Sequence, residues 1–127
     1  IARDYENTEF FFGARDKDHL YYTKKIKEVS PLHISTNDGS VGEKGFVTEI
    51  LAKRLAELKG EKLIFFNCGP PAMIDAVVQI EKQYASEEKI FSSLELMTKC
   101  GVGICGACSN KSGKRLCVDG PYFGENK

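Results

Sequence analysis

The fold class is decided by residues 32–66, which read LHISTNDGSVGEKGFVTEILAKRLAELKGEKLIFF. This stretch opens with an apolar segment at 32–36, passes through a loop with three glycines at 37–45, and continues with helical periodicity from Phe46 to about Lys59. A second apolar segment follows at 63–66. Apolar strands joined through a helix are typical of neighbouring parallel strands, so residues 32–66 predict a β–α–β unit.

The same alternation continues on both sides of this unit. Residues 9–12 and 90–97 are further apolar strand candidates. One predicted helix has the face Tyr22, Ile26 and Val29, and another begins at Pro71 and has the face Met73, Val77, Ile80 and Tyr84. We therefore expect an α/β fold with a parallel sheet covered on both faces. The loops after each strand would meet at the carboxyl edge, where glycines favour a nucleotide crevice.

Composition excludes several classes of function. The chain has 127 residues, and its 18 basic residues balance 18 acidic ones, so nothing in it favours a nucleic acid partner. It has no apolar run of the length that a membrane span requires, and no secretory signal opens it, so we expect a cytoplasmic protein. The charged side chains from Lys53 to Lys62 are interpreted as a solvated helix face.

Four of the five cysteines lie between positions 100 and 117, in the pattern C-x4-C-x2-C-x8-C. The spacing of the first three cysteines matches that of plant-type [2Fe–2S] proteins, whereas the fourth follows more closely than in plant ferredoxins; four thiolates complete the ligand set of such a cluster. Glycines between the cysteines allow backbone N–H groups to approach the sulfurs. The alternative is a structural zinc site, although such sites usually pair two separate C-x2–4-C knuckles. The cluster ligands would be Cys100, Cys105, Cys108 and Cys117.

Two further expectations concern the cysteines. A turn at residues 111–114 is expected to return Cys117 to the other three cysteines. The fifth cysteine, Cys68, is interpreted either as a small buried residue at a strand end or as part of the nucleotide crevice. His19 and His33 are too isolated to be interpreted as metal ligands.

Three motifs carry a family resemblance. The segment CGPPAM at 68–73 resembles a signature of the ferredoxin–NADP reductase superfamily, and residues 38–48 (DGSVGEKGFVT) and 12–15 (FGAR) resemble other parts of the same NAD-binding domain. The tail, from Ser93 through CGVGICGAC to Phe123, resembles the C-terminal module of dihydroorotate dehydrogenase electron-transfer subunits. The resemblance covers nearly the whole chain.

The resemblance implies a Rossmann-like NAD-binding domain of ferredoxin reductase type at residues 1–97 and a small [2Fe–2S] loop module at 98–127. Electrons would pass from an FMN-containing dihydroorotate dehydrogenase catalytic subunit through the cluster to FAD and NAD in pyrimidine biosynthesis. Such a chain belongs to a hetero-oligomer, and it is not catalytic alone. Residues expected at the nucleotide crevice are Gly13, Arg15, Asp38, Gly39, Cys68, Gly69, Pro70 and Met73.

The family's flavin-binding barrel and first glycine-rich strand would precede this segment, so the chain is expected to be a C-terminal fragment that does not hold FAD alone. Two alternatives stay open. One is the small subunit of an NAD(P)H–ferredoxin or sulfide oxidoreductase, whose members tend to have aspartate where this chain has Cys100. The other, of a different class, is a zinc-stabilised binding domain without a redox role.

Overall fold

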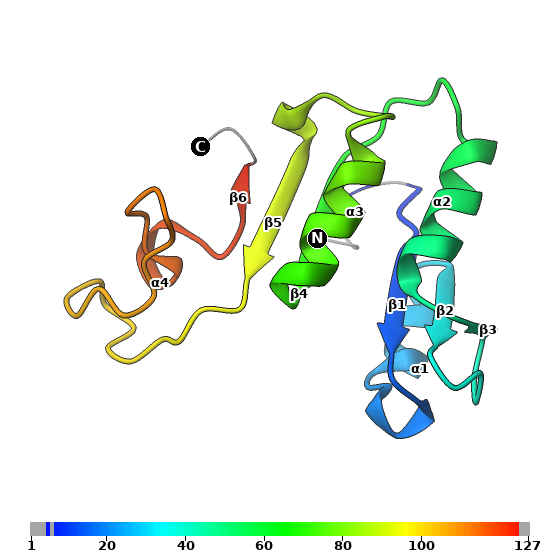
Figure 1. Cartoon of the computed structure of the whole chain (residues 1–127), viewed down its shortest axis with the longest axis horizontal. Coiled ribbons are helices and arrows are strands. Elements are labelled where there is room, and N and C mark those ends of the chain that lie inside the picture. Colours follow the sequence, from blue (N-terminus) through cyan, green and yellow to red (C-terminus); the bar gives the residue numbers. More distant parts are fainter. Residues whose placement is uncertain (1–4, 6, 125–127) are drawn as a thin grey trace. The chain divides into compact units, whose positions relative to one another are not determined.

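The computed structural model of the chain describes residue 5 and residues 7–124. The chain divides into two compact units, residues 1–58 and residues 59–127 (Figure 1). The predicted domain boundary after residue 97 is a different division, and it stays a prediction. None of the helices in the described part of the chain combines the length and the apolar character that crossing a membrane requires.

The first unit is built on a small parallel sheet with the strand order β1-β2-β3. Strand β1 pairs with β2 from Phe10↔Leu32 to Ala14↔Thr36. The predicted strand at 32–36 is confirmed without change. The elements are β1 (Phe10–Ala14), a 3-10 turn η1 (Lys17–His19), α1 (Thr23–Lys27), β2 (Leu32–Thr36), β3 (Glu43–Lys44) and α2 (Val47–Glu57).

Helix α2 packs against β1 and β2, and its buried side chains are Val47, Ile50, Leu51 and Leu55. The predicted helix is confirmed, but Phe46 precedes its first turn and is 64% exposed. Val47 is buried there instead, directly over β1: a Cβ on Gly13 would lie 2.7 Å from the Cβ of Val47. The close approach of α2 to β1 therefore requires glycine at position 13.

The predicted helical face of Tyr22, Ile26 and Val29 is wrong. Helix α1 has only five residues, and Tyr22 precedes it in a left-handed conformation with φ of 57°. After Ile26 the chain turns back on itself, since the N–H groups of Val29 and Ser30 both donate to the Ile26 carbonyl. Tyr22 and Val29 are consequently exposed, and Ile26 alone contributes to the interior.

The second unit contains another three-stranded sheet, with the order β4-β5-β6. The predicted β–α–β unit at 32–66 is therefore wrong, because its two strands belong to different sheets. Strands β4 and β5 are parallel, whereas β6 is antiparallel to β5 and was not anticipated. The core consists of Ile74, Val78 and Ile90, with Phe65, Met73 and Leu94 packed around them. The elements are β4 (Phe65–Gly69), α3 (Pro71–Glu81), η2 (Glu87–Lys89), β5 (Ile90–Leu94), α4 (Leu116–Asp119) and β6 (Phe123–Gly124).

Strand β4 continues three residues beyond the predicted end at Phe66. A polar Asn67 is accommodated inside the strand because its side-chain amide donates a 2.7 Å hydrogen bond to the carboxylate of Glu81, which is 1% exposed. Helix α3 begins at Pro71 as predicted, but its buried face is Ile74, Val77, Val78 and Glu81. Of the predicted face, Val77 is buried, Met73, Ile80 and Tyr84 are half-buried, and Tyr84 lies beyond the end of α3.

Candidate functional site

The four clustered cysteines gather in the second unit as two pairs. The thiol of Cys105 hydrogen-bonds to Cys100, and the thiols of Cys108 and Cys117 interact in the same way. A weaker electrostatic interaction links Cys117 to Cys100. Cys108 is 2% exposed, so one side of the group is closed to solvent. The four cysteines thus form two pairs, and the predicted convergence of all four on one cluster stays a prediction.

The pairing of the thiols helps to distinguish between the two metal groups, zinc and a [2Fe–2S] cluster, that four cysteines could bind. Among the described residues, no group of three or more His, Cys, Asp or Glu side chains is arranged to hold a metal ion. A tetrahedral zinc site needs four ligands around one ion, whereas in a [2Fe–2S] cluster two thiolates bind each iron and bridging sulfides complete the coordination. Two thiol pairs fit the two-iron group better than they fit a single zinc ion.

The loop between Cys100 and Cys105 directs backbone N–H groups at the Cys100 sulfur. The N–H groups of Ile104 and Cys105 donate to Cys100 Sγ at 3.3 and 3.5 Å. The donor at Cys105, with those at Val102 and Ile104, lowers the pKa of the Cys100 thiol to about 6. The loop therefore favours the thiolate, the form in which cysteine binds a metal.

Cys108 and Cys117, the second pair, also alter the pKa of each other's thiol. The backbone N–H of Cys117 lowers the pKa of the Cys108 thiol. The hydrogen bond to Cys108, and then burial, raise the pKa of the Cys117 thiol. Two thiols that share a hydrogen bond are close enough to bind the same iron, which would compensate the negative charges of both thiolates.

A hairpin turn brings Cys117 back to the loop, as predicted. The Asn110 side chain accepts hydrogen bonds from the N–H groups of Ser112 and Lys114, and the Leu116 N–H donates to the Cys108 carbonyl at 3.0 Å. Short helix α4 then carries Cys117. The predicted turn at 111–114 is confirmed, with Asn110 as the residue that organises it.

Arg115 is a positioning residue that sequence reasoning missed. Its guanidinium donates a 2.6 Å hydrogen bond to the carbonyl of Gly103, and its backbone N–H donates to Asp119 at 2.7 Å. It therefore joins the loop that carries Cys100 and Cys105 to the helix that carries Cys117. A single arginine two positions before a cysteine has no sequence signature, since its importance depends on a carbonyl twelve residues away.

In the first unit, the loops that follow β1 and β2 are joined at the carboxyl edge of the sheet. The Asp38 N–H donates to the carbonyl of Arg15 at 3.3 Å, and the Lys17 N–H donates to the hydroxyl of Ser40 at 2.8 Å. Ser40 in turn donates to Asp38 through its hydroxyl and its N–H, which lowers the pKa of the Asp38 carboxyl. The predicted meeting of Arg15, Asp38 and Gly39 is confirmed.

The end of β4 brings together the other predicted nucleotide residues. A Cβ on Gly69 would collide with the methyl group of Met73, and the Pro70 carbonyl accepts the first hydrogen bonds of α3. Cys68 is exposed, so its interpretation as a buried strand-end residue is wrong. Tyr122 is its neighbour: burial raises the pKa of Tyr122, and the charge of Cys68 raises it further. Nucleotide binding at these residues stays a prediction.

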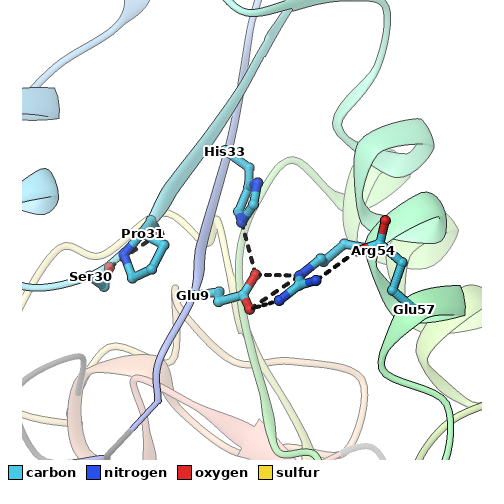
Figure 2. A network of polar contacts seen from close by, with 6 residues as sticks. All are labelled: Glu9, Ser30, Pro31, His33, Arg54 and Glu57. Carbon is cyan, nitrogen blue, oxygen red and sulfur yellow. Dashed lines mark hydrogen bonds and ion pairs between the residues drawn. The ribbon is translucent and has the colours of Figure 1, made fainter.

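A polar network at the other edge of the first unit was also missed (Figure 2). Glu9 accepts hydrogen bonds from Arg54 on α2, the shortest 2.6 Å long, and lies 2.8 Å from His33 on β2. Arg54 is therefore not part of a solvated face, which corrects the interpretation of that residue. The hydrogen bond from Arg54 lowers the pKa of Glu9. The network fastens the segment before β1 to both β2 and α2.

Parallel strands with glycine loops at their carboxyl ends, followed by a four-cysteine loop, define an NAD-linked oxidoreductase with an iron–sulfur module. Comparison with known protein families supports this class. Residues 2–79 match the oxidoreductase NAD-binding domain, and the chain belongs to this family. Residues 95–127 match the iron–sulfur cluster binding domain of dihydroorotate dehydrogenase B. These matches confirm the resemblance and the α/β fold class inferred from the sequence motifs.

Individual relatives carry one shared name. The chain is 41% identical over 116 residues to the probable dihydroorotate dehydrogenase B (NAD(+)) electron transfer subunit of Methanocaldococcus jannaschii, covering 91% of this chain and 44% of that protein. It is 38% identical over 124 residues to the dihydroorotate dehydrogenase B (NAD(+)) electron transfer subunit of Fusobacterium nucleatum, covering 91% of this chain and 45% of that protein. The chain thus spans less than half the length of these curated relatives.

Proposed function

We propose that the chain is part of an electron-transfer subunit that passes electrons from an FMN-containing dihydroorotate dehydrogenase through a [2Fe–2S] cluster to FAD and NAD, in pyrimidine biosynthesis. The observation that carries the proposal is the pairing of four thiols on a loop whose N–H groups point at Cys100. The shared name of the relatives supports the choice of this pathway over ferredoxin or sulfide reduction.

Each part of the chain has a distinct task in this proposal. Cys100, Cys105, Cys108 and Cys117 would hold the cluster, which supplies a one-electron carrier between flavins. The loop N–H groups stabilise negative charge on Cys100, and Arg115 keeps the two halves of the site together. No proton transfer is required of these residues, because the flavins perform the two-electron chemistry.

The nucleotide would lie against residues that the structure brings together within each unit. In the first unit these are Arg15, Asp38 and Gly39; Asp38 is a carboxylate at neutral pH and suits the hydroxyl groups of a ribose. In the second unit, Gly69 and Pro70 leave the backbone open at the start of α3. FAD would be bound mainly by protein outside this chain.

The setting that we propose is a hetero-oligomer in the cytoplasm. All five cysteines are free thiols, and four of them would be lost as ligands in a compartment that forms disulfides. The partner in the complex is the FMN-containing catalytic subunit, which supplies electrons from dihydroorotate.

The proposal is tested by asking which reductant reaches the cluster. The cluster-loaded chain is mixed under anaerobic conditions with the FMN-containing dihydroorotate dehydrogenase subunit of the same organism, and dihydroorotate is added. We expect the visible absorption to bleach and an electron paramagnetic resonance signal of a reduced [2Fe–2S] cluster to appear. Omission of dihydroorotate is the control. Reduction by reduced ferredoxin but not by this mixture would replace the proposal with the ferredoxin oxidoreductase alternative.

A further inference from the structure

Two neighbouring tyrosines stand exposed in front of helix α1 in the first unit. Tyr21 is 62% exposed and Tyr22 is 73% exposed. Val29, which follows the helix, is also exposed, at 39%. Adjacent apolar side chains that lie in solvent often mark an interaction site, so this corner of the first unit is a candidate for one.

The backbone of Tyr22 is strained. Its φ of 57° lies in the left-handed region, which residues other than glycine, asparagine and aspartate seldom adopt. The carbonyl of Tyr22 accepts a hydrogen bond from the Ile26 N–H at 3.0 Å, which starts the single turn of α1. Burial of the ring does not compensate the strain, because the ring is exposed. A strained residue with no packing role is a candidate for a functional one.

Helix α1, which contacts β2 (Figure 1), has an inner and an outer side. Thr23 and Ile26 are half-buried and Ser30 is buried, and these spacings of three and four residues mark the inner side. The residues between them are exposed and include three lysines. We define the α1 patch as Tyr21, Tyr22, Lys24, Lys25, Lys27 and Val29.

The lysines and the tyrosines of the α1 patch belong to one surface. The Lys25 ammonium lies 5.5 Å from the centre of the Tyr22 ring, within the range of a cation–π contact. Between residues 21 and 29 the single acidic side chain is Glu28, which leaves an excess of two positive charges. Residues 15–19 add two basic and two acidic side chains and hence no net charge. The patch is therefore basic, in a chain whose total charge is zero.

The composition of the α1 patch favours a lipid surface over a protein partner. Specific protein interfaces are enriched in arginine, depleted in lysine and built around a dry apolar centre. The α1 patch has three lysines, no arginine and Val29 as its one aliphatic side chain. Tyrosine is the type of residue that lies among lipid headgroups, and lysine clusters are attracted to anionic lipids.

We propose that the α1 patch is a docking surface for an anionic lipid bilayer. The tyrosine rings would lie at the level of the headgroups, and the three lysines would face the negative charge of the lipids. Each lysine near such a surface strengthens binding by about fivefold, so three lysines give a weak and reversible attachment. The inference goes beyond the proposed function and does not depend on the cluster.

The test measures cosedimentation of the full chain with vesicles, since the chain has no tryptophan to report binding by fluorescence. One set of vesicles is phosphatidylcholine alone, and the other contains equal parts of phosphatidylcholine and phosphatidylserine. We expect the chain to bind the second set and to be released by high salt. Changing Lys24, Lys25 and Lys27 together to glutamine is expected to weaken this binding by about tenfold or more.

Tyr22→Gly separates the role of the ring from folding. Glycine adopts a positive φ without strain, so this variant is expected to be at least as stable as the parent chain in urea denaturation. We nevertheless expect it to bind phosphatidylserine vesicles severalfold more weakly, because the ring is lost. Unchanged vesicle binding by Tyr22→Gly would remove the tyrosine from the docking surface and contradict the proposal.

Two control variants match these changes elsewhere on the chain. Changing Lys59, Lys62 and Lys89 together to glutamine removes the same charge from three other exposed positions. Phe46→Gly removes a ring that is 64% exposed at the start of α2. Equal losses in the two lysine variants, or equal binding to both vesicle types, would overturn the proposal. Binding to polyglutamate without binding to vesicles would also overturn it, and would assign the α1 patch to an acidic protein.

Discussion

The ion pair between Glu9 and Arg54 is expected to stabilise the first unit, and a double-mutant cycle measures by how much. Two nitrogens of Arg54 donate to the Glu9 carboxylate, Nε at 2.9 and 3.2 Å and Nη2 at 2.6 Å. The side chains are 21% and 33% exposed. Hydrogen bonds to charged groups contribute about 1.5–3 kcal/mol when shielded, and partial exposure reduces this to about 1–2 kcal/mol.

The assay compares the parent chain, Glu9→Gln, Arg54→Met and the double variant by urea denaturation followed by far-ultraviolet circular dichroism. Hydrogen exchange at the amides of β1 and β2 locates the effect in the first unit. The matched control cycle uses Glu43 and Lys53, which are also 2.6 Å apart but are 56% and 68% exposed. We expect a coupling energy of about 1–2 kcal/mol for the first pair and below about 0.5 kcal/mol for the control pair. Equal coupling in the two cycles would refute the reasoning.

The same pair predicts an acid dependence with a definite sign. Arg54, and then His33, lower the pKa of Glu9 below its ordinary 4.5. A carboxyl group whose pKa is lower in the folded state contributes stability above its unfolded pKa, and this stability is lost as the pH falls through the folded pKa. The coupling energy is therefore expected to be present above the unfolded pKa of Glu9 and to disappear as the pH falls through its lowered folded pKa. A coupling that persists after Glu9 is protonated would show that charge is not its source.

Three further substitutions test separate parts of the structure. Gly13→Ala is expected to destabilise the first unit by about 1–3 kcal/mol in urea denaturation, because the added methyl group meets Val47. Adding Val47→Ala is expected to restore part of this stability. A single variant as stable as the parent chain would contradict the close packing of Gly13 against Val47. Gly103→Ala is expected to reduce iron uptake more than Gly113→Ala, since both positions have positive φ but only the first lacks room for a Cβ; equal losses would assign the effect to φ alone. Cys105→Ser is expected to abolish or severely weaken the cluster and to expose residues 98–124 to limited proteolysis, and a protease-resistant tail in that variant would contradict a fold that depends on the cluster.

The parts of the fold that could be predicted were those with a strong local pattern. The strand at 32–36, the start of α3 at Pro71 and the turn before Cys117 follow from apolar runs, proline geometry and turn residues. In each case the sequence signal lies within a few neighbouring residues, although the strand at 32–36 pairs with the more distant β1. The four clustered cysteines lie within eighteen positions, and the structure brings them together as two pairs.

The parts that could not be predicted depend on contacts between distant residues. Asn67 looked like the end of a strand, but its partner Glu81 lies fourteen positions later and allows the strand to continue. Arg54 looked like a surface charge, but its partner Glu9 lies 45 positions away. The pattern of a single sequence contains no signal for such distant pairs. The extension of β4 and the network around Arg54 were therefore not predicted.

Chemical analysis of the purified chain tests the central claim most directly. After reconstitution without oxygen, we expect iron and acid-labile sulfide in equal amounts, about two of each per chain, with the visible absorption of a [2Fe–2S] cluster. Changing all four clustered cysteines to serine should remove both elements. One zinc ion per chain with no labile sulfide would contradict the account and leave a zinc-stabilised domain in its place.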